Sequence, residues 1–113
     1  MQYLHFGIPT QDEKSWAGHL ADMKVHFSDP TADPYGIEWL KFGTDSPMHE
    51  AIRSKPHVAF AVDDLDAALE GKNVICPPYS PMPGFRFAFI DHEGAVVELT
   101  ETKPAKRCAC GCG

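Results

Sequence analysis

Two histidines and two glutamates are the residues of this chain whose types and spacing best suit metal chemistry. In sequence order they are His5, Glu38, His57 and Glu98, and each lies in its own strand-like stretch: residues 3–8, 36–42, 57–62 and 95–100. Imidazole and carboxylate groups on rigid strands bind a divalent metal ion and leave coordination positions open for chemistry. The repeated order His then Glu predicts a duplicated half-site, with four ligands that meet if the two halves pack face to face.

This ligand set indicates which metals and which reactions to expect. A mixture of nitrogen and oxygen ligands suits Zn, Ni, Co, Mn or Fe, whereas a closed structural zinc site would favour cysteine. A metal of this kind polarises two neighbouring oxygens of a substrate and stabilises the enolate or enediolate that forms when a proton leaves the adjacent carbon. A carboxylate at the site acts as the base, and Glu98 and Glu38 are the candidate catalytic residues.

The elements that must position these residues are mainly strands. We expect a buried strand at 3–8, then a short helix within 11–23 that runs into a strand. A polar connector with two prolines spans 44–56. In the second half, acidic residues at the start and a glycine at the end predict a short helix over 63–71. Further strands are expected at 24–28, 36–43, 57–62 and 74–76, with a hairpin of 85–90 and 95–100 joined by a type I turn at 91–94.

The first strand of this hairpin carries a candidate substrate-binding residue. Side chains alternate between the two faces of a strand, so Phe85, Phe87 and Phe89 share one apolar face and Arg86 lies on the other. Two arrangements are open. Arg86 faces the cavity and binds an anionic part of the substrate, or it faces solvent and pairs with an acid.

Two segments of the second half resemble a known superfamily. Residues 57–71 form a strand headed by histidine and followed by DDLDAAL, and residues 85–99 contain RFAFIDHEGAVVEL. The first resembles the start of the second module of the vicinal oxygen chelate superfamily, which includes glyoxalase I, methylmalonyl-CoA epimerase, extradiol dioxygenases and bleomycin-resistance proteins. The second resembles its closing hairpin, which commonly reads Asp-Pro-Asp-Gly, an apolar pair and Glu-Leu. The similarity covers residues 3–102.

The resemblance implies an α+β fold. Two βαβββ-like modules, about 1–50 and 55–102, would form a curved mixed sheet that encloses a cleft, in a single glyoxalase-like domain over 1–102. Each module would supply two metal ligands, His5 and Glu38 from the first and His57 and Glu98 from the second. The interval 6–37 is shorter than 58–97, so we expect a shortened first module. In that case His49 or Glu50 is the alternative to Glu38.

The resemblance also implies a function, with rivals. The expected activity is that of a metal-dependent lyase or isomerase resembling glyoxalase I, acting on a small oxygen-chelating substrate, and the expected assembly is a homodimer. One rival is a non-haem Fe(II) dioxygenase of the extradiol type, which would use only His5, His57 and Glu98. Another is a metal-free protein that sequesters a small molecule, as bleomycin-resistance proteins do.

Composition excludes other classes of partner. A net charge of −6 and scattered Lys and Arg residues argue against nucleic acid. No apolar run approaches the roughly 20 residues of a membrane span, and no secretory signal precedes the first strand, so we expect a cytoplasmic protein. We expect residues 103–113 to form a flexible tail, in which Cys108, Cys110 and Cys112 either capture a soft metal ion or are incidental.

Overall fold

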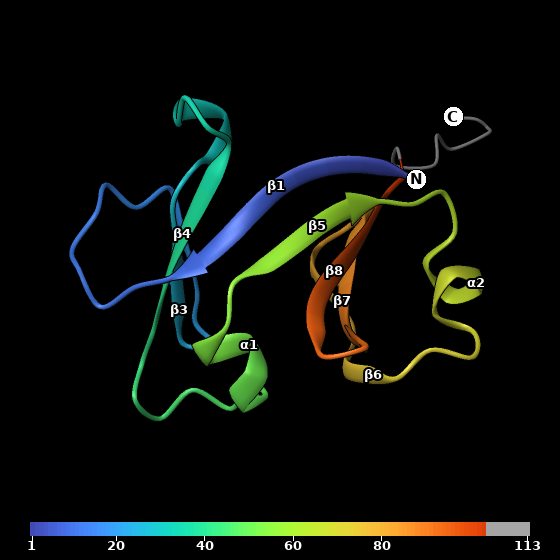
Figure 1. Ribbon diagram of the computed structural model, residues 1–113. Coiled ribbons are helices and arrows are strands. Elements are labelled where there is room, and N and C mark those ends of the chain that lie inside the picture. The colour runs from blue at the N-terminus through green and yellow to red at the C-terminus, as the bar shows by residue number, and fades with distance from the viewer. Residues whose placement is uncertain (104–113) are drawn as a thin grey trace.

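The computed structural model describes residues 1–103, and strands form most of this part of the chain. Eight strands make one mixed sheet in the order β2-β3-β4-β1-β5-β8-β7-β6. In Figure 1, β1 and β5 run side by side and the two wings of the sheet descend from them, β3 and β4 on one side and β7 and β8 on the other. The sheet is therefore strongly curved and nearly barrel-shaped. The strands are β1 (Gln2–Pro9), β2 (Gly18–Leu20), β3 (Val25–Phe27), β4 (Ile37–Phe42), β5 (His57–Ala61), β6 (Val74–Met82), β7 (Phe85–His92) and β8 (Ala95–Thr102).

The four central strands combine parallel and antiparallel pairing. β1 pairs with β5 in antiparallel fashion, while β1 pairs with β4, and β5 with β8, in parallel. Parallel neighbours need a long crossover connection, and in each wing the intervening strands provide it. The predicted curved mixed sheet is confirmed.

Helices are few and short in the described part of the chain. They are η1 (Pro30–Ala32), α1 (Glu50–Ser54) and α2 (Leu65–Leu69). The Asp64 side chain caps α2 by accepting a hydrogen bond from the Ala67 N–H. Leu65 is fully buried against the convex face of β7 and β8, in a cluster with Ala88, Ile90 and Leu99. None of these helices is long and apolar enough to cross a membrane.

The larger apolar cluster lies on the concave side of the sheet. Both wings contribute to it, with Leu40 and Phe42 from β4 and Phe87 and Phe89 from β7. Ile52 of α1 joins them and is almost completely buried. The concave side is therefore walled by apolar side chains from both halves of the chain.

Several sequence-based expectations about elements are wrong. The expected helix within 11–23 is absent, and β2 lies there instead. The reason is a cross-strand contact, because Gly18 packs against the Phe27 ring so closely that a Cβ would lie 2.4 Å from Phe27 Cζ. The connector contains helix α1, and the strand expected at 74–76 continues to Met82 through three prolines. An edge strand tolerates proline because one side of its backbone forms no ladder.

The turn of the β7–β8 hairpin differs in type from the expected one. Glu93 and Gly94, at the tip of the β7–β8 hairpin, both have positive φ angles, of 52° and 94°. This is the requirement of a type I′ turn, which matches the twist of the two strands, and not of the expected type I turn. The three cysteines of the predicted tail lie outside the described residues.

Candidate metal centre

The register of the central strands places the first histidine and the last glutamate in one row. His5 of β1 pairs with Ala59 of β5, and Ala59 pairs with Glu98 of β8. Ala59 is fully buried and its small side chain separates the two larger ones. Directly paired residues share a face of the sheet, so the side chains of His5 and Glu98 both rise from the concave face across Ala59.

The other two residues lie in the next row. Glu38 of β4 pairs with Gly7 of β1, and Gly7 pairs with His57 of β5. The His57 ring occupies the space above Gly7, where a Cβ would lie 2.2 Å from His57 Cε1. Each row thus consists of a histidine and a glutamate separated by a small residue. Sequence reasoning missed Gly7, although a glycine inside a strand signals a close approach of another group.

The four side chains converge in space. His5 Nε2 lies 3.2 Å from Glu38 Oε1 and 3.6 Å from Glu98 Oε1, and His57 Nε2 lies 3.1 Å from Glu98 Oε1. One ligand atom from each of the four residues lies within 4.8 Å of all the others. The structure therefore brings together all four residues that the sequence singled out.

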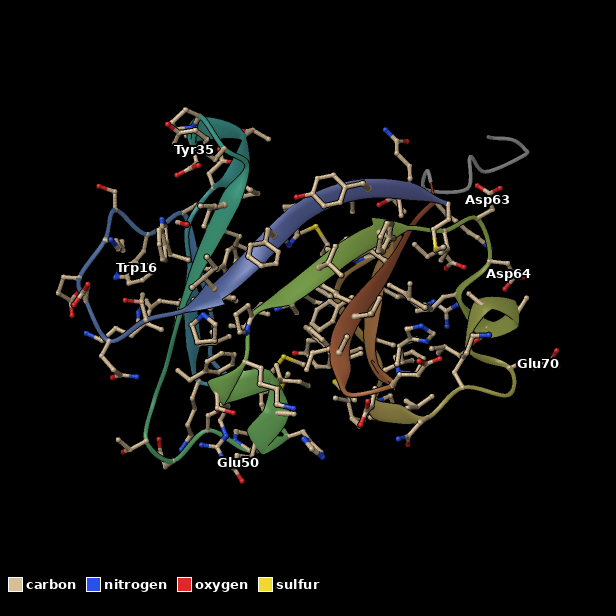
Figure 2. All side chains as sticks on the ribbon, in the orientation of Figure 1. Trp16, Tyr35, Glu50, Asp63, Asp64 and Glu70 are labelled. Carbon is tan, nitrogen blue, oxygen red and sulfur yellow. The ribbon has the colours of Figure 1, made fainter. Side chains whose placement is uncertain are left out.

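Two residues of this group are buried and the other two, His5 and Glu38, are partly buried. His57 is 1% exposed and Glu98 8% exposed. The acidic residues Glu50, Asp63, Asp64 and Glu70, by contrast, lie on the outside of the molecule (Figure 2). Burying ionisable groups is costly unless they are paired or bind a metal ion, so the four residues on the concave face need one another or a bound ion as partners.

The histidine nitrogens lack the partners that burial demands. His5 Nε2, His57 Nδ1 and His57 Nε2 are buried without a hydrogen bond to any described residue, although carboxylate oxygens lie near both Nε2 atoms. A buried polar atom without a partner costs about 1–3 kcal/mol. Packing holds the His57 ring in place, since it meets the Phe89 ring edge-on with centroids 5.1 Å apart.

The charges within the group are strongly coupled. Burial favours the neutral form of His5, but contacts with the carboxylates of Glu38 and Glu98 and their negative charge outweigh it and raise the His5 pKa to about 9. Burial likewise favours neutral Glu98, but the two imidazoles outweigh it and lower the Glu98 pKa to about 2. The group thus holds an ionised Glu98 carboxylate, which attracts a positive charge.

These residues fit a divalent metal ion. Ligand atoms about 2.0–2.2 Å from one ion lie at most about 4.4 Å apart. The 4.8 Å spread of the four atoms exceeds this limit only slightly, so small side-chain movements close the difference. An ion would also satisfy the buried Nε2 atoms, and two imidazoles with two carboxylates suit Zn, Ni, Co, Mn or Fe.

A cavity of about 420 Å³ lies above the four residues on the concave side. All four line it, together with apolar side chains from both wings, among them Leu40, Phe42 and Phe87. The arrangement places polar chemistry at one end of an apolar chamber. This is the usual composition of a small-molecule site, in which a few polar groups fix the orientation of a ligand.

The structure shows where Arg86 and His49 lie relative to this cavity and to Glu38. Arg86 is not among the residues that line this cavity; its Nε donates a hydrogen bond to Glu101 Oε1 at 3.0 Å, and its guanidinium also pairs with Asp66. This is the second of its two expected arrangements, and the substrate-binding role predicted for Arg86 has no geometric support here.

His49 caps α1 through Nδ1, which accepts a hydrogen bond from the Ala51 N–H. It therefore does not take the place of Glu38.

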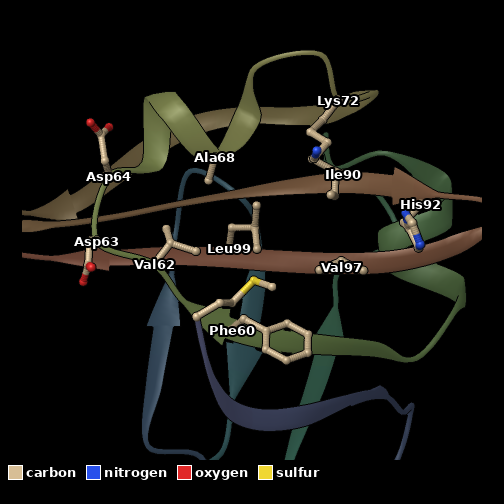
Figure 3. A pocket seen from close by; sticks show the side chains of 11 residues that line it. Phe60, Val62, Asp63, Asp64, Ala68, Lys72, Ile90, His92, Val97 and Leu99 are labelled. Atoms are coloured by element: carbon tan, nitrogen blue, oxygen red, sulfur yellow. The ribbon is translucent and has the colours of Figure 1, made fainter.

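A second hollow, of about 570 Å³, lies on the convex side between α2 and the sheet (Figure 3). Apolar residues such as Phe60, Val62 and Leu99 form its floor, and Asp64 and Lys72 lie at its margin. None of the four converging residues reaches it. It is larger than the concave cavity, but it carries no comparable group of ligands.

Comparison with known proteins informs the fold. No protein-family model matches the sequence, and no curated protein matches it. Among solved structures, the hypothetical protein BH1468 from Bacillus halodurans C-125 aligns with a TM-score of 0.61 and 21% identity over 94% of this chain and 97% of that chain. The likeness supports the curved eight-stranded sheet, which is compatible with a glyoxalase-like or bleomycin-resistance-like fold.

Proposed function

We propose that this protein is a metal-dependent lyase or isomerase resembling glyoxalase I, which acts on a small substrate with two neighbouring oxygens. The observation that carries the proposal is the convergence of His5, Glu38, His57 and Glu98, with ligand atoms within 4.8 Å of one another and buried histidine nitrogens that form no hydrogen bond of good geometry. A bound divalent ion polarises such oxygens and favours loss of a proton from the adjacent carbon.

The two glutamates differ in their surroundings, and this assigns them different tasks. Glu98 Oε1 lies between both imidazoles, 3.1 Å from His57 Nε2 and 3.6 Å from His5 Nε2, which suits a fixed ligand. Glu38 contacts only His5 and its side chain is more exposed, 16% against 11%. Glu38 is therefore the better candidate for the base that accepts the substrate proton, since it is less constrained.

We also propose that the chain consists of two βαβββ-like modules, the first without its helix. Their equivalence is supported by register. Glu38 pairs with the residue two positions after His5, and Glu98 pairs with the residue two positions after His57. The sheet order is symmetric about the β1–β5 pair as well, because β4 and β8, β3 and β7, and β2 and β6 occupy matching places.

Proton exchange tests the function without knowledge of the natural substrate. The protein is purified without chelator, its metal content is measured by elemental analysis, and exchange of the carbon-bound protons of hydroxyacetone is followed by NMR in heavy water. We expect one metal ion per chain and metal-dependent exchange. Glu38→Gln should slow the exchange by about 100-fold or more while much of the metal is retained.

A matched control is Glu50→Gln, because Glu50 is exposed on α1. This variant should exchange protons like the unaltered protein. Protein that holds no metal ion, before or after incubation with Zn, Ni, Co, Mn or Fe, would contradict the proposal and favour the metal-free binding protein. Metal-loaded protein without exchange on any hydroxyketone would contradict the lyase or isomerase activity alone.

One geometric feature favours a second candidate function. His5, His57 and Glu98 form a compact group in which a single carboxylate oxygen lies near both imidazoles. Two histidines and one carboxylate are the ligand set of non-haem Fe(II) oxygenases. Oxygen consumption with a catechol and Fe(II), insensitive to Glu38→Gln, would support an extradiol-type dioxygenase instead.

A further inference from the structure

We infer that the concave cavity takes a neutral, largely apolar molecule whose two neighbouring oxygens lie at one end, and that it rejects molecules with an additional carboxylate or phosphate. This inference rests on the proposed metal centre and concerns the class of substrate at that centre. The evidence for it is the set of side chains that line the cavity.

The first argument concerns charge. The only ionisable side chains among the described residues that line the cavity are the four of the metal centre. No Lys or Arg is among them, and the side chains of Thr100 and Thr102 are the other polar groups. Two carboxylates and one divalent ion sum to zero, so the centre offers no surplus positive charge to an anionic substituent. A second anion on the ligand would lose its water without gaining a partner.

The second argument concerns the walls. Phenylalanines come from three strands, with Phe27 on β3, Phe42 on β4, and Phe85, Phe87 and Phe89 on β7. Methionines add flexible apolar surface at positions 23, 48 and 82. Aromatic faces and thioethers favour contact with carbon-rich ligands and adapt to their shape. A volume of about 420 Å³ is at the lower end of the range for ligand sites, which limits the ligand to a small molecule.

A pair of chelators that differ in one substituent tests the inference. Allomaltol is a neutral hydroxypyranone with a methyl group, and comenic acid is the same ring with a carboxylate in place of that methyl group. Both are titrated into Co(II)-loaded protein, and binding is followed by the visible absorption of the cobalt ion. The affinity of each chelator for the Co(II)-loaded protein is divided by its affinity for aqueous Co(II). We expect allomaltol to bind at least about tenfold more tightly than comenic acid.

A variant with a new positive charge at the rim provides the matched test. Met82 lines the cavity but is 59% exposed, so Met82→Lys adds a cation at the mouth without disturbing the core. This variant should bind comenic acid at least about fivefold more tightly than the unaltered protein does. Its affinity for allomaltol should equal that of the unaltered protein. Tyr35→Lys is the control, because Tyr35 is 81% exposed and does not line the cavity.

The outcomes separate this inference from the proposed function. Loss of Co(II) on dialysis would overturn both the metal centre and the inference. Retained Co(II) with comenic acid bound as tightly as allomaltol, or more tightly, would overturn the inference alone. A gain in comenic acid affinity that is equal in Met82→Lys and Tyr35→Lys would also overturn it, because the effect would then reflect net charge and not the cavity.

Discussion

Gly7 lies directly opposite His57 in the β1–β5 ladder, and the imidazole of His57 fills the space that a side chain at position 7 would occupy. A Cβ there would lie 2.2 Å from Cε1 and 2.4 Å from Nε2 of the ring, closer than atoms of these types approach one another. The glycine thus determines where the histidine ring sits. It does so by leaving space, without a hydrogen bond.

Gly7→Ala should therefore displace the His57 ring and weaken metal binding by about tenfold or more, the loss typical of disturbing a ligand's support. Metal affinity is measured by competition with a chromophoric chelator. Gly43→Ala is the control, since its nearest contact is the Asp45 side chain at 3.1 Å, outside the metal centre. Equal metal affinity in Gly7→Ala and the unaltered protein would contradict this role of Gly7.

Metal removal should lower stability. An ion that binds only the folded state at 100 times its dissociation constant adds about 2.7 kcal/mol to the free energy of unfolding. For a chain of this size, we expect a chelator to lower the melting temperature by about 10 °C in thermal unfolding. The melting temperature of His57→Ala should not respond to the chelator, whereas His92→Ala, altered at the exposed last residue of β7, should respond fully. A chelator effect in His57→Ala would place the metal elsewhere.

Sequence reasoning reached the site because its signals are local to each strand. A histidine or glutamate within an apolar stretch, and the alternation of Phe85, Phe87 and Phe89, identify strands and their faces. A glycine within a strand signals only that some group approaches it closely. That this group is the ring of His57, and that Ala59 separates His5 from Glu98, follows only once β1, β4, β5 and β8 are in register.

The segment 11–23 differs from its expected helical structure for a related reason. The spacing of Trp16, Leu20 and Met23 is compatible with a helix, but the pairing of β2 with β3 overrides this local preference. Gly18, a poor helix former, is the residue that lets β2 lie against the Phe27 ring. Tertiary contacts of this kind leave no periodic signal in the sequence.

The ion pair of Arg86 with Glu101 predicts a dependence of stability on acidic pH. Arg86 and the Leu65 backbone N–H both donate hydrogen bonds to the buried Glu101 carboxylate, and these hold its pKa at about 2, below the ordinary 4.5. The pKa is lower in the folded state, so this stabilisation is complete above pH of about 5 and is lost as the pH falls towards about 2.

Glu101→Gln should remove about 2 kcal/mol from the free energy of unfolding at neutral pH, because it removes the charge that binds Arg86. Its stability should then fall less steeply than that of the unaltered protein between pH of about 5 and about 2. Urea unfolding at a series of pH values measures both effects. Parallel curves for the two proteins over this acidic range would show that Glu101 does not provide the dependence.

A side-chain hydrogen bond joins the two ends of the sheet. The Tyr79 hydroxyl on β6 donates a hydrogen bond to Asp22 Oδ2, in the turn between β2 and β3, at 2.8 Å. β2 and β6 are the two edge strands, so this bond connects opposite edges of the curved sheet across the concave side. It links the two wings that supply the apolar walls of the cavity.

Tyr79→Phe removes this bond and keeps the ring that packs near Phe87, with centroids 5.8 Å apart. The contact is exposed, so we expect only a small loss in the free energy of unfolding. Amide exchange in β2, β3 and β6 should quicken more than in β1 and β5, since the edges separate while the centre of the sheet stays paired. Tyr35→Phe, altered at a tyrosine that is 81% exposed, should leave exchange unchanged. A contact that closes the two edges affects those edges first. Uniform acceleration of amide exchange in every strand would therefore contradict this role and mean that Tyr79 stabilises the whole fold.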